Sequence, residues 1–174
     1  TAVNLRFSAR LKRSRKAVSA EYCSLPVYIT DAVDTPCLFG LLRPAVYLTG
    51  KAAGEPQTMR HAVEHERTHF LHGDHIWAIL RCACLALHWY NPLVWWAALL
   101  SRNDAELACD ESTILRLGEG ERAAYGRTLV QLTCEKRPAL VHTATTMTGS
   151  GRSIRERITL IVKKPKMAVY TLAV

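Results

Sequence analysis

Two histidines four residues apart, with a glutamate directly after the first, constrain the fold of this chain more than any other feature. They occur in the stretch AVEHERTHFLHGDH, residues 62–75, as His65, Glu66 and His69. Residues i and i+4 lie on one face of an α-helix, so both imidazoles can hold one metal ion if this stretch is helical. An amphipathic helix that is merely rich in histidine is the alternative.

Zinc is the metal that this pattern favours. A catalytic zinc ion takes three protein ligands and keeps a fourth position for water. Glu66 directly follows the first histidine, so its carboxylate can reach that water without being a ligand and can act as a general base. The pattern therefore predicts His65 and His69 as two of three ligands.

A candidate for the third ligand lies downstream, in NDAELACDE, residues 103–111. Glu106 and Asp110 are four residues apart and share a face of the predicted helix. One can bind zinc while the other accepts the free N–H of a ligand histidine. Acidic residues on a helix are usually solvated, but beside HERTH we favour the metal-binding interpretation.

The charge of the chain is concentrated near its ends. The 174 residues carry a net charge of +8 and are 49% hydrophobic and 22% charged, which indicates one folded domain. Basic clusters occupy residues 6–16 and 152–166, and the second leads into the apolar run MAVYTLAV. This order is typical of the cytoplasmic flank of a membrane-spanning helix, although eight residues cannot span a bilayer. We expect a piece of a membrane protein; a solvated basic tail with a last buried strand is the alternative.

The rest of the chain reads as a single domain over residues 1–174, mainly helical with a small sheet. Short β-branched and aromatic runs between residues 25 and 50 predict a small antiparallel sheet or hairpin. A helix is expected over residues 55–71, with Gly73 as its stop. We further expect a basic lead-in over residues 1–20 that is partly helical, a helix in ERAAYGRTLVQLTCE, an exposed linker over residues 141–153, and a basic flank over residues 154–174.

One segment, residues 76–100, is unusually apolar and holds all four tryptophans. Proline disfavours helix at the residue before it, so the segment should break at Asn91-Pro92. Arg81 and His88 also interrupt it, which argues against a simple spanning helix. A core helix pair, or a helix whose tryptophan face meets the bilayer interface, fits better.

The remaining histidines and the cysteines are given ordinary structural interpretations. None of these histidines is expected to be a ligand: His61, His72 and His75 flank the motif, and a surface position is an equal alternative for His61 and His72. His88 lies in an apolar helix and is expected to be a hydrogen-bonded core residue, and His142 is expected in the loop. No CxxC pair occurs, so reduced and mostly buried thiols are expected for Cys23, Cys37, Cys82, Cys84, Cys109 and Cys134.

These residues carry a resemblance to a known family. HERTH followed by GDH, then ALHWYNPLVWWA and RNDAELACDE, resemble in order and spacing the metallopeptidase domain of the BlaR/MecR-type antibiotic-sensing signal transducers, and TPCLFGLLRPAVYLT resembles the strand pair ahead of their active helix. The resemblance implies a gluzincin-like zinc peptidase fold with zinc bound by His65, His69 and Glu106. It also implies that Glu66 is the catalytic base and that Asp110 supports the site. Arg67 departs from the commoner pattern, in which an apolar residue is frequent.

The resemblance further implies a domain on the cytoplasmic side of a bacterial membrane, joined to spanning helices. Members of the family are thought to cleave themselves after the catalytic helices and to bring about inactivation of a repressor, so we expect such a cut between Thr143 and Ser153. The substrate is expected to lie along an edge of the small sheet. The alternative is a non-proteolytic zinc-binding signalling module. A nucleic-acid binder is disfavoured, because the basic residues lie at the termini and the tryptophans in an apolar segment.

Overall fold

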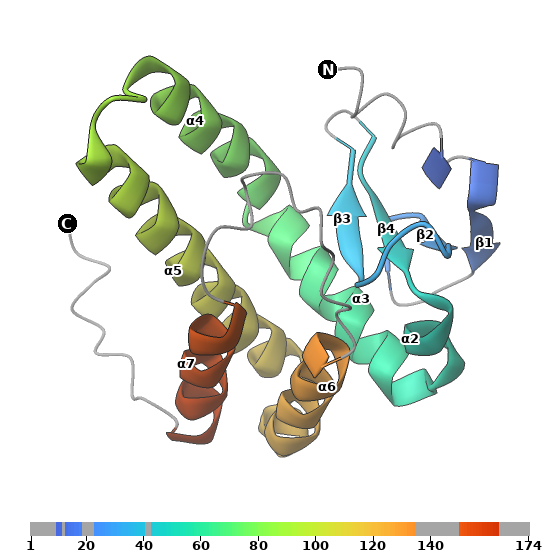
Figure 1. The fold of residues 1–174 in the computed structure, drawn as a ribbon. Coiled ribbons are helices and arrows are strands. Elements are labelled where there is room, and N and C mark those ends of the chain that lie inside the picture. The colour runs from blue at the N-terminus through green and yellow to red at the C-terminus, as the bar shows by residue number, and fades with distance from the viewer. Residues whose placement is uncertain (1–9, 12, 19–22, 41–42, 135–149, 164–174) are drawn as a thin grey trace.

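The fold is a small sheet followed by a set of helices, as a computed structural model shows for residues 10–11, 13–18, 23–40, 43–134 and 150–163 (Figure 1). The strands are β1 (Lys16–Val18), β2 (Val27–Ile29), β3 (Cys37–Phe39) and β4 (Ala45–Leu48). The helices are α2 (Gly50–Gly54), α3 (Pro56–Leu71), α4 (Asp74–Leu87), α5 (Pro92–Leu117), the 3-10 turn η1 (Glu119–Glu121), α6 (Arg122–Cys134) and α7 (Ser150–Lys163). The expected mainly helical α+β class is confirmed; the gluzincin assignment stays a prediction.

The sheet is mixed, not antiparallel as predicted. Its strand order is β1-β2-β4-β3, and the central pair, β2 and β4, runs parallel with Val27 opposite Val46. The two outer pairs are antiparallel. The chain leaves β2, forms β3 at the edge of the sheet and then turns back to form β4 between β2 and β3. Strand β4 is therefore antiparallel to β3 and parallel to β2. Short apolar runs show where strands lie but do not determine their order.

Helix α3 packs along one face of the sheet, next to α5 (Figure 1). Pro56 opens it at a position that needs no N–H donor, and Gly73, with φ of 70°, turns the chain into α4. Ala62 and Val63 are buried against the side chains of β2 and β4. The prediction of a helix over residues 55–71 with a stop at Gly73 is confirmed.

The basic segments near the two ends are partly built into the fold. Leu11 is fully buried against Ala45 and Tyr47 on the face of the sheet opposite α3, and β1 extends the sheet. The lead-in is therefore partly strand as well as helical. Residues 150–153, predicted as linker, form the first turn of α7, and residues 154–163 continue that helix against α5 and α6. Residues 141–149 and 164–174 lie outside the described residues.

Helices α4 and α5 form a hairpin that extends away from the sheet (Figure 1). The break at Asn91-Pro92 is confirmed: the Asn91 side chain accepts the backbone N–H of Leu93 at 3.0 Å and caps α5. Every residue of α4 is described and none is buried, so the expectation of a core helix pair is wrong. Within the described residues, no single helix is long and apolar enough to cross a membrane; α3 and α4 meet that requirement only together, across a bend of 58°.

Candidate metal centre

The two predicted histidine ligands and the predicted glutamate ligand converge between α3 and α5. His65 Nε2 lies 3.1 Å from His69 Nε2, and Glu106 Oε2 lies 3.8 Å and 3.9 Å from these two nitrogens. Tetrahedral zinc with bonds of about 2.1 Å separates its ligand atoms by roughly 3.4 Å. The three donor atoms therefore need to shift by only a few tenths of an ångström to hold one zinc ion.

The second ring nitrogen of His65 is held by Tyr125 from α6. The Tyr125 hydroxyl lies 2.8 Å from His65 Nδ1 and donates its proton to Asp110 Oδ1 at 2.7 Å. A hydroxyl has one proton, so His65 Nδ1–H must be the donor toward Tyr125. This arrangement leaves the lone pair on Nε2, the atom that faces His69. Burial, followed by the charges of His69 and Arg157, lowers the pKa of His65 to about 3, so the ring is neutral.

Asp110 was predicted to support a ligand histidine. In the structure, the Tyr125 hydroxyl lies between Asp110 and His65 and contacts both. Asp110 Oδ1 is 3.6 Å from His65 Nδ1, with the Tyr125 hydroxyl in hydrogen-bonding contact with both. The Asp110 side chain is only 4% exposed. It accepts two hydrogen bonds from Arg157 on α7, at 2.6 and 2.7 Å, which satisfies a carboxylate that burial would otherwise destabilise.

His69 has its own carboxylate partner at the start of α4. Its Nδ1 lies 2.5 Å from Asp74 Oδ2, which fixes the donor on Nδ1 and leaves Nε2 for a metal. Burial lowers the pKa of His69, but the nearby carboxylates of Glu66, Glu106 and Asp74 outweigh it and raise the pKa above its usual value. Asp74, the partner of His69, is close in the sequence, only five residues after it.

Glu66 lies buried between the sheet and the histidines. Its side chain accepts the backbone N–H of Leu38 on β3. Burial, with a further contribution from the charge of Glu106, raises its pKa to about 7. A carboxyl group with a pKa near neutrality can both accept and return a proton at physiological pH, which is what a general acid–base catalyst requires.

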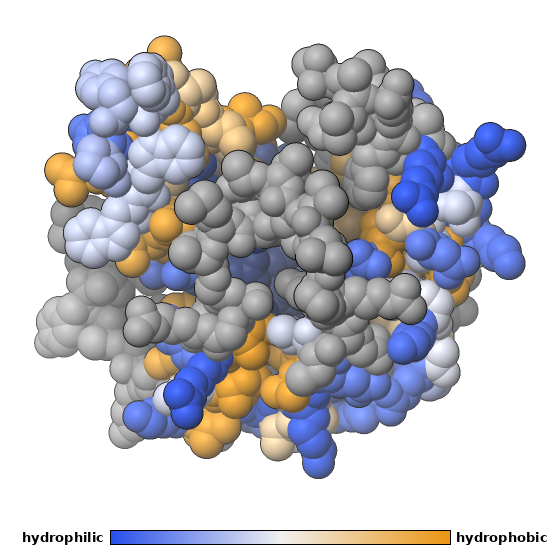
Figure 2. Space-filling model, viewed as in Figure 1, coloured by the Kyte–Doolittle hydropathy of each residue, from blue (hydrophilic) through white to orange (hydrophobic). Residues whose placement is uncertain are grey.

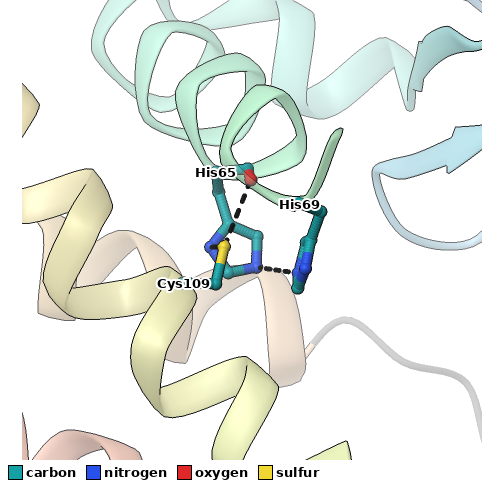
Figure 3. Close-up of side chains that lie close together, drawn as sticks. All are labelled: His65, His69 and Cys109. Atoms are coloured by element: carbon teal, nitrogen blue, oxygen red, sulfur yellow. Dashed lines mark hydrogen bonds between the residues drawn. The ribbon is translucent and has the colours of Figure 1, made fainter. Parts of the chain in front are cut away.

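Cys109 offers a second possible set of metal donors, together with His65 and His69 (Figure 3). Its sulfur lies 3.5 Å from His65 Nδ1, the nitrogen that also contacts Tyr125, and its S–H points to the His65 carbonyl oxygen at 3.3 Å. Burial raises the pKa of this thiol, which disfavours the thiolate that binds metals. We therefore favour Glu106, whose oxygen faces the Nε2 atoms of both histidines.

Several histidine and cysteine expectations are wrong. His61 is 1% exposed, so the surface alternative weighed for it is wrong, and it lies 2.9 Å from the Thr128 hydroxyl. His88 is exposed at the end of α4, not in a core. Cys82 and Cys84 are exposed as well, although all five cysteines that the structure describes in full are free, as expected. His142 lies outside the described residues.

Sequence reasoning missed three residues that hold this site: Asp74, Tyr125 and Arg157. Asp74 belongs to the GDH segment, which begins four residues after His69, and it directly follows Gly73, the predicted stop of the helix. Tyr125 and Arg157 come from two later helices, and one sequence carries no signal that those helices pack against the site. Arg67, the departure from the commoner pattern, forms an ion pair with Glu64 at 3.1 Å.

Comparison with known proteins agrees with the resemblance. The family model described as BlaR1 peptidase M56 matches residues 5–161. The regulatory protein BlaR1 of Bacillus licheniformis is 25% identical over 132 residues, which cover 75% of this chain and 22% of that protein. The methicillin resistance mecR1 protein of Staphylococcus aureus is 22% identical over 155 residues, which cover 87% of this chain and 26% of that protein. The chain thus spans about a quarter of the length of these relatives.

Proposed function

The chain belongs to the BlaR1 peptidase M56 family, and on this basis we propose that it is the zinc-dependent endopeptidase domain of a bacterial membrane signal transducer. The family is one of peptidases; the zinc ion, the residue roles and the setting are the proposal. One observation carries it: the His65, His69 and Glu106 donor atoms converge within 3.9 Å of one another, beside the buried Glu66.

The donor set suits zinc chemistry. Two imidazole nitrogens and one carboxylate oxygen form the ligand set of many catalytic zinc sites. A zinc ion held there would lower the pKa of a water molecule to near 7 and polarise the peptide carbonyl. Tyr125 and Asp74 orient the two imidazoles, and Arg157 holds the Glu106 carboxylate at 3.0 Å.

Glu66 is the proposed general base. It takes a proton from the water that attacks the peptide carbonyl and returns it to the leaving amine, so the carboxyl group ends each cycle as it began. The hydrogen bond from the Leu38 N–H keeps its carboxylate at the sheet side of the site. In the metal-free site, burial raises its pKa to about 7, which supports a role in proton transfer.

The substrate is proposed to bind along β3. This strand lies at the edge of the sheet, and pairs only with β4 among the described strands. In support, the Leu38 N–H donates to the Glu66 side chain, so this part of β3 lies next to the candidate site. A peptide added to that edge would receive main-chain hydrogen bonds beside the general base, which suits an enzyme that cleaves extended segments of protein.

The setting and the partners follow from the family resemblance. We propose a location at the cytoplasmic side of the bacterial membrane, joined to spanning helices of a longer protein. The proposed substrates are the chain's own segment between Thr143 and Ser153, and a transcriptional repressor. Residues 143–149 of that segment lie outside the described residues.

The test compares two glutamine variants of α3. Glu66 and Glu64 are equally buried, at 8% exposed, but Glu64 pairs with Arg67 instead of facing the site. The zinc-loaded wild type should cleave denatured casein and a peptide of residues 135–153, as followed by mass spectrometry. Glu66→Gln should keep its zinc and lose at least ~100-fold in rate, while Glu64→Gln keeps its activity. Cleavage by Glu66→Gln at the wild-type rate would contradict the proposal.

A further inference from the structure

The hairpin of α4 and α5 exposes an apolar surface that the peptidase proposal does not use (Figure 2). Large hydrophobic side chains that are 43% to 73% exposed occur along both helices and at the turn between them. They are Ile76, Trp77, Ile79, Leu80, Leu87, Trp89, Tyr90, Leu93, Trp95, Trp96, Leu99 and Leu100. A patch of this size on a folded domain marks an interaction surface.

The exposed side chains surround the hairpin instead of forming one stripe. Residues 76–80 are all exposed, and five consecutive residues cover more than a full turn of a helix. Residues 86–90 are likewise all exposed. A second copy of the chain would cover one side of the hairpin only, whereas a helix that is apolar all round suits a fluid apolar medium.

Charge marks a level part-way along this apolar surface, with residues 76–80 on the side of the candidate metal centre. Residues 82–100 contain no aspartate, glutamate, lysine or arginine. The Arg81 guanidinium lies 3.3 Å from the Ser101 hydroxyl across the hairpin, so Arg81 and the neighbouring, exposed Arg102 stand at the same height. Arg81 and Arg102 thus place two positive charges at the same height along the hairpin, and the uncharged apolar residues 82–100 lie between them and the tip. This order matches the boundary between the phosphates and the acyl chains of a bilayer.

The length of the hairpin sets how deep it can reach. From Arg81 to Tyr90 the chain rises about 13 Å, less than half of the ~30 Å hydrocarbon thickness of a bilayer. The turn carries His88, Tyr90 and Asn91, which are too polar for the bilayer centre. Tryptophan and tyrosine favour the interface, and interfacial helices enter by about 5–10 Å.

We infer that the α4–α5 hairpin inserts its tip into one leaflet of an anionic bilayer, with Arg81 and Arg102 at the level of the phosphates. The chain's net charge of +8 favours an anionic surface and opposes close association of two copies. Glu106 follows Arg102 by one helical turn, about 6 Å along α5. The candidate metal centre is thereby held at the membrane surface, within reach of segments that emerge from it.

Three of the four tryptophans, Trp89, Trp95 and Trp96, lie beyond Arg81 toward the hairpin tip, and Trp77 lies about one turn before it, so intrinsic fluorescence reports insertion chiefly through these three. The purified chain is mixed with vesicles of phosphatidylcholine alone or with an equal share of phosphatidylglycerol, and emission and co-sedimentation are recorded. The anionic vesicles should bind it, shift the emission to shorter wavelength, and bind less as salt is raised. Absence of both binding and shift with anionic vesicles would overturn the inference.

Two variants keep the test specific. Leu87→Asp and Leu93→Asp change side chains that are 73% and 66% exposed, so the fold should survive, as circular dichroism can verify. Each should weaken vesicle binding more than ~10-fold. Val162→Asp, at a 75% exposed position on α7, is the matched control and should bind as the wild type does. Equal binding by all three variants would overturn the inference. Glu66→Gln should bind normally, which separates this result from the peptidase proposal.

Discussion

Arg157 Nη1 lies 3.0 Å from Glu106 Oε2, the same oxygen that faces both candidate zinc-binding histidines. Arg157 also forms two hydrogen bonds with Asp110, at 2.6 and 2.7 Å, and its side chain is 11% exposed. One guanidinium thus neutralises two carboxylates of the site. Burial lowers the pKa of Arg157, but the interactions with Asp110 and Glu106 outweigh burial and raise it above its usual value. Helix α7 is therefore an integral part of the candidate metal centre, although it is far from HERTH in the sequence.

Replacement of Arg157 by alanine should weaken both folding and zinc binding. It leaves the Asp110 and Glu106 carboxylates without their cation, which costs about 3 kcal/mol for a buried pair. Loss of an outer-shell partner of this kind typically lowers zinc affinity ~10–100-fold. Urea denaturation and chelator competition measure the two effects. Arg155→Ala, at an exposed position of the same helix, should change neither; if the two variants behave alike, Arg157 does not hold the site.

Replacement of Tyr125 by phenylalanine should weaken zinc binding with little change of shape. The variant loses the hydroxyl that accepts from His65 Nδ1 and donates to Asp110. We expect a loss of about 1–2 kcal/mol in the free energy of unfolding and a ~10–100-fold loss in zinc affinity. Tyr90→Phe, on the exposed hairpin, serves as the control. Unchanged zinc affinity in Tyr125→Phe would show that the hydroxyl does not orient His65.

Glu66 should make the metal-free protein less stable as pH rises. Its pKa is about 7 in the folded state, because of burial, against 4.5 as the ordinary value. Between these values the folded chain binds more protons than the unfolded chain, so this group lowers the free energy of unfolding from about pH 4.5 to pH 7. Glu66→Gln removes the effect, and its stability relative to the wild type should rise by about 2–3 kcal/mol over that window. Urea denaturation with a chelator at pH 5, 6, 7 and 8 measures it; a pH-independent difference contradicts the assignment.

The local parts of this molecule could be predicted from the sequence. The helix over residues 55–71 rests on a periodic pattern with a glycine stop, and the break at Asn91-Pro92 rests on the sterics of proline. The i, i+4 spacing of His65 and His69 is likewise a property of one helix. These features depend on neighbouring residues alone, which is why they could be read without a structure.

The non-local parts could not. Strand order depends on which segment returns to the centre of the sheet, so the parallel pairing of β2 and β4 was missed. Tyr125 and Arg157 join the site from α6 and α7 through packing of Ile114, Tyr125, Leu129 and Ile161. His88 was expected in a core because its neighbours are apolar, yet it is exposed and no residue from 76 to 100 is buried. An apolar composition predicts that a segment avoids water, but it does not say whether the segment packs in the protein core or against another apolar environment.

The most direct test of the central claim is X-ray absorption of the zinc-loaded domain, with the zinc content measured on the same sample. We expect one zinc per chain, two imidazole nitrogens at about 2.0–2.1 Å and only oxygen or nitrogen as further ligands. Glu106→Ala should lose the zinc, and Cys109→Ser should keep both the zinc and the spectrum. Sulfur scattering at about 2.3 Å that disappears in Cys109→Ser, or zinc retained by Glu106→Ala, would show that His65, His69 and Glu106 are not the zinc ligands.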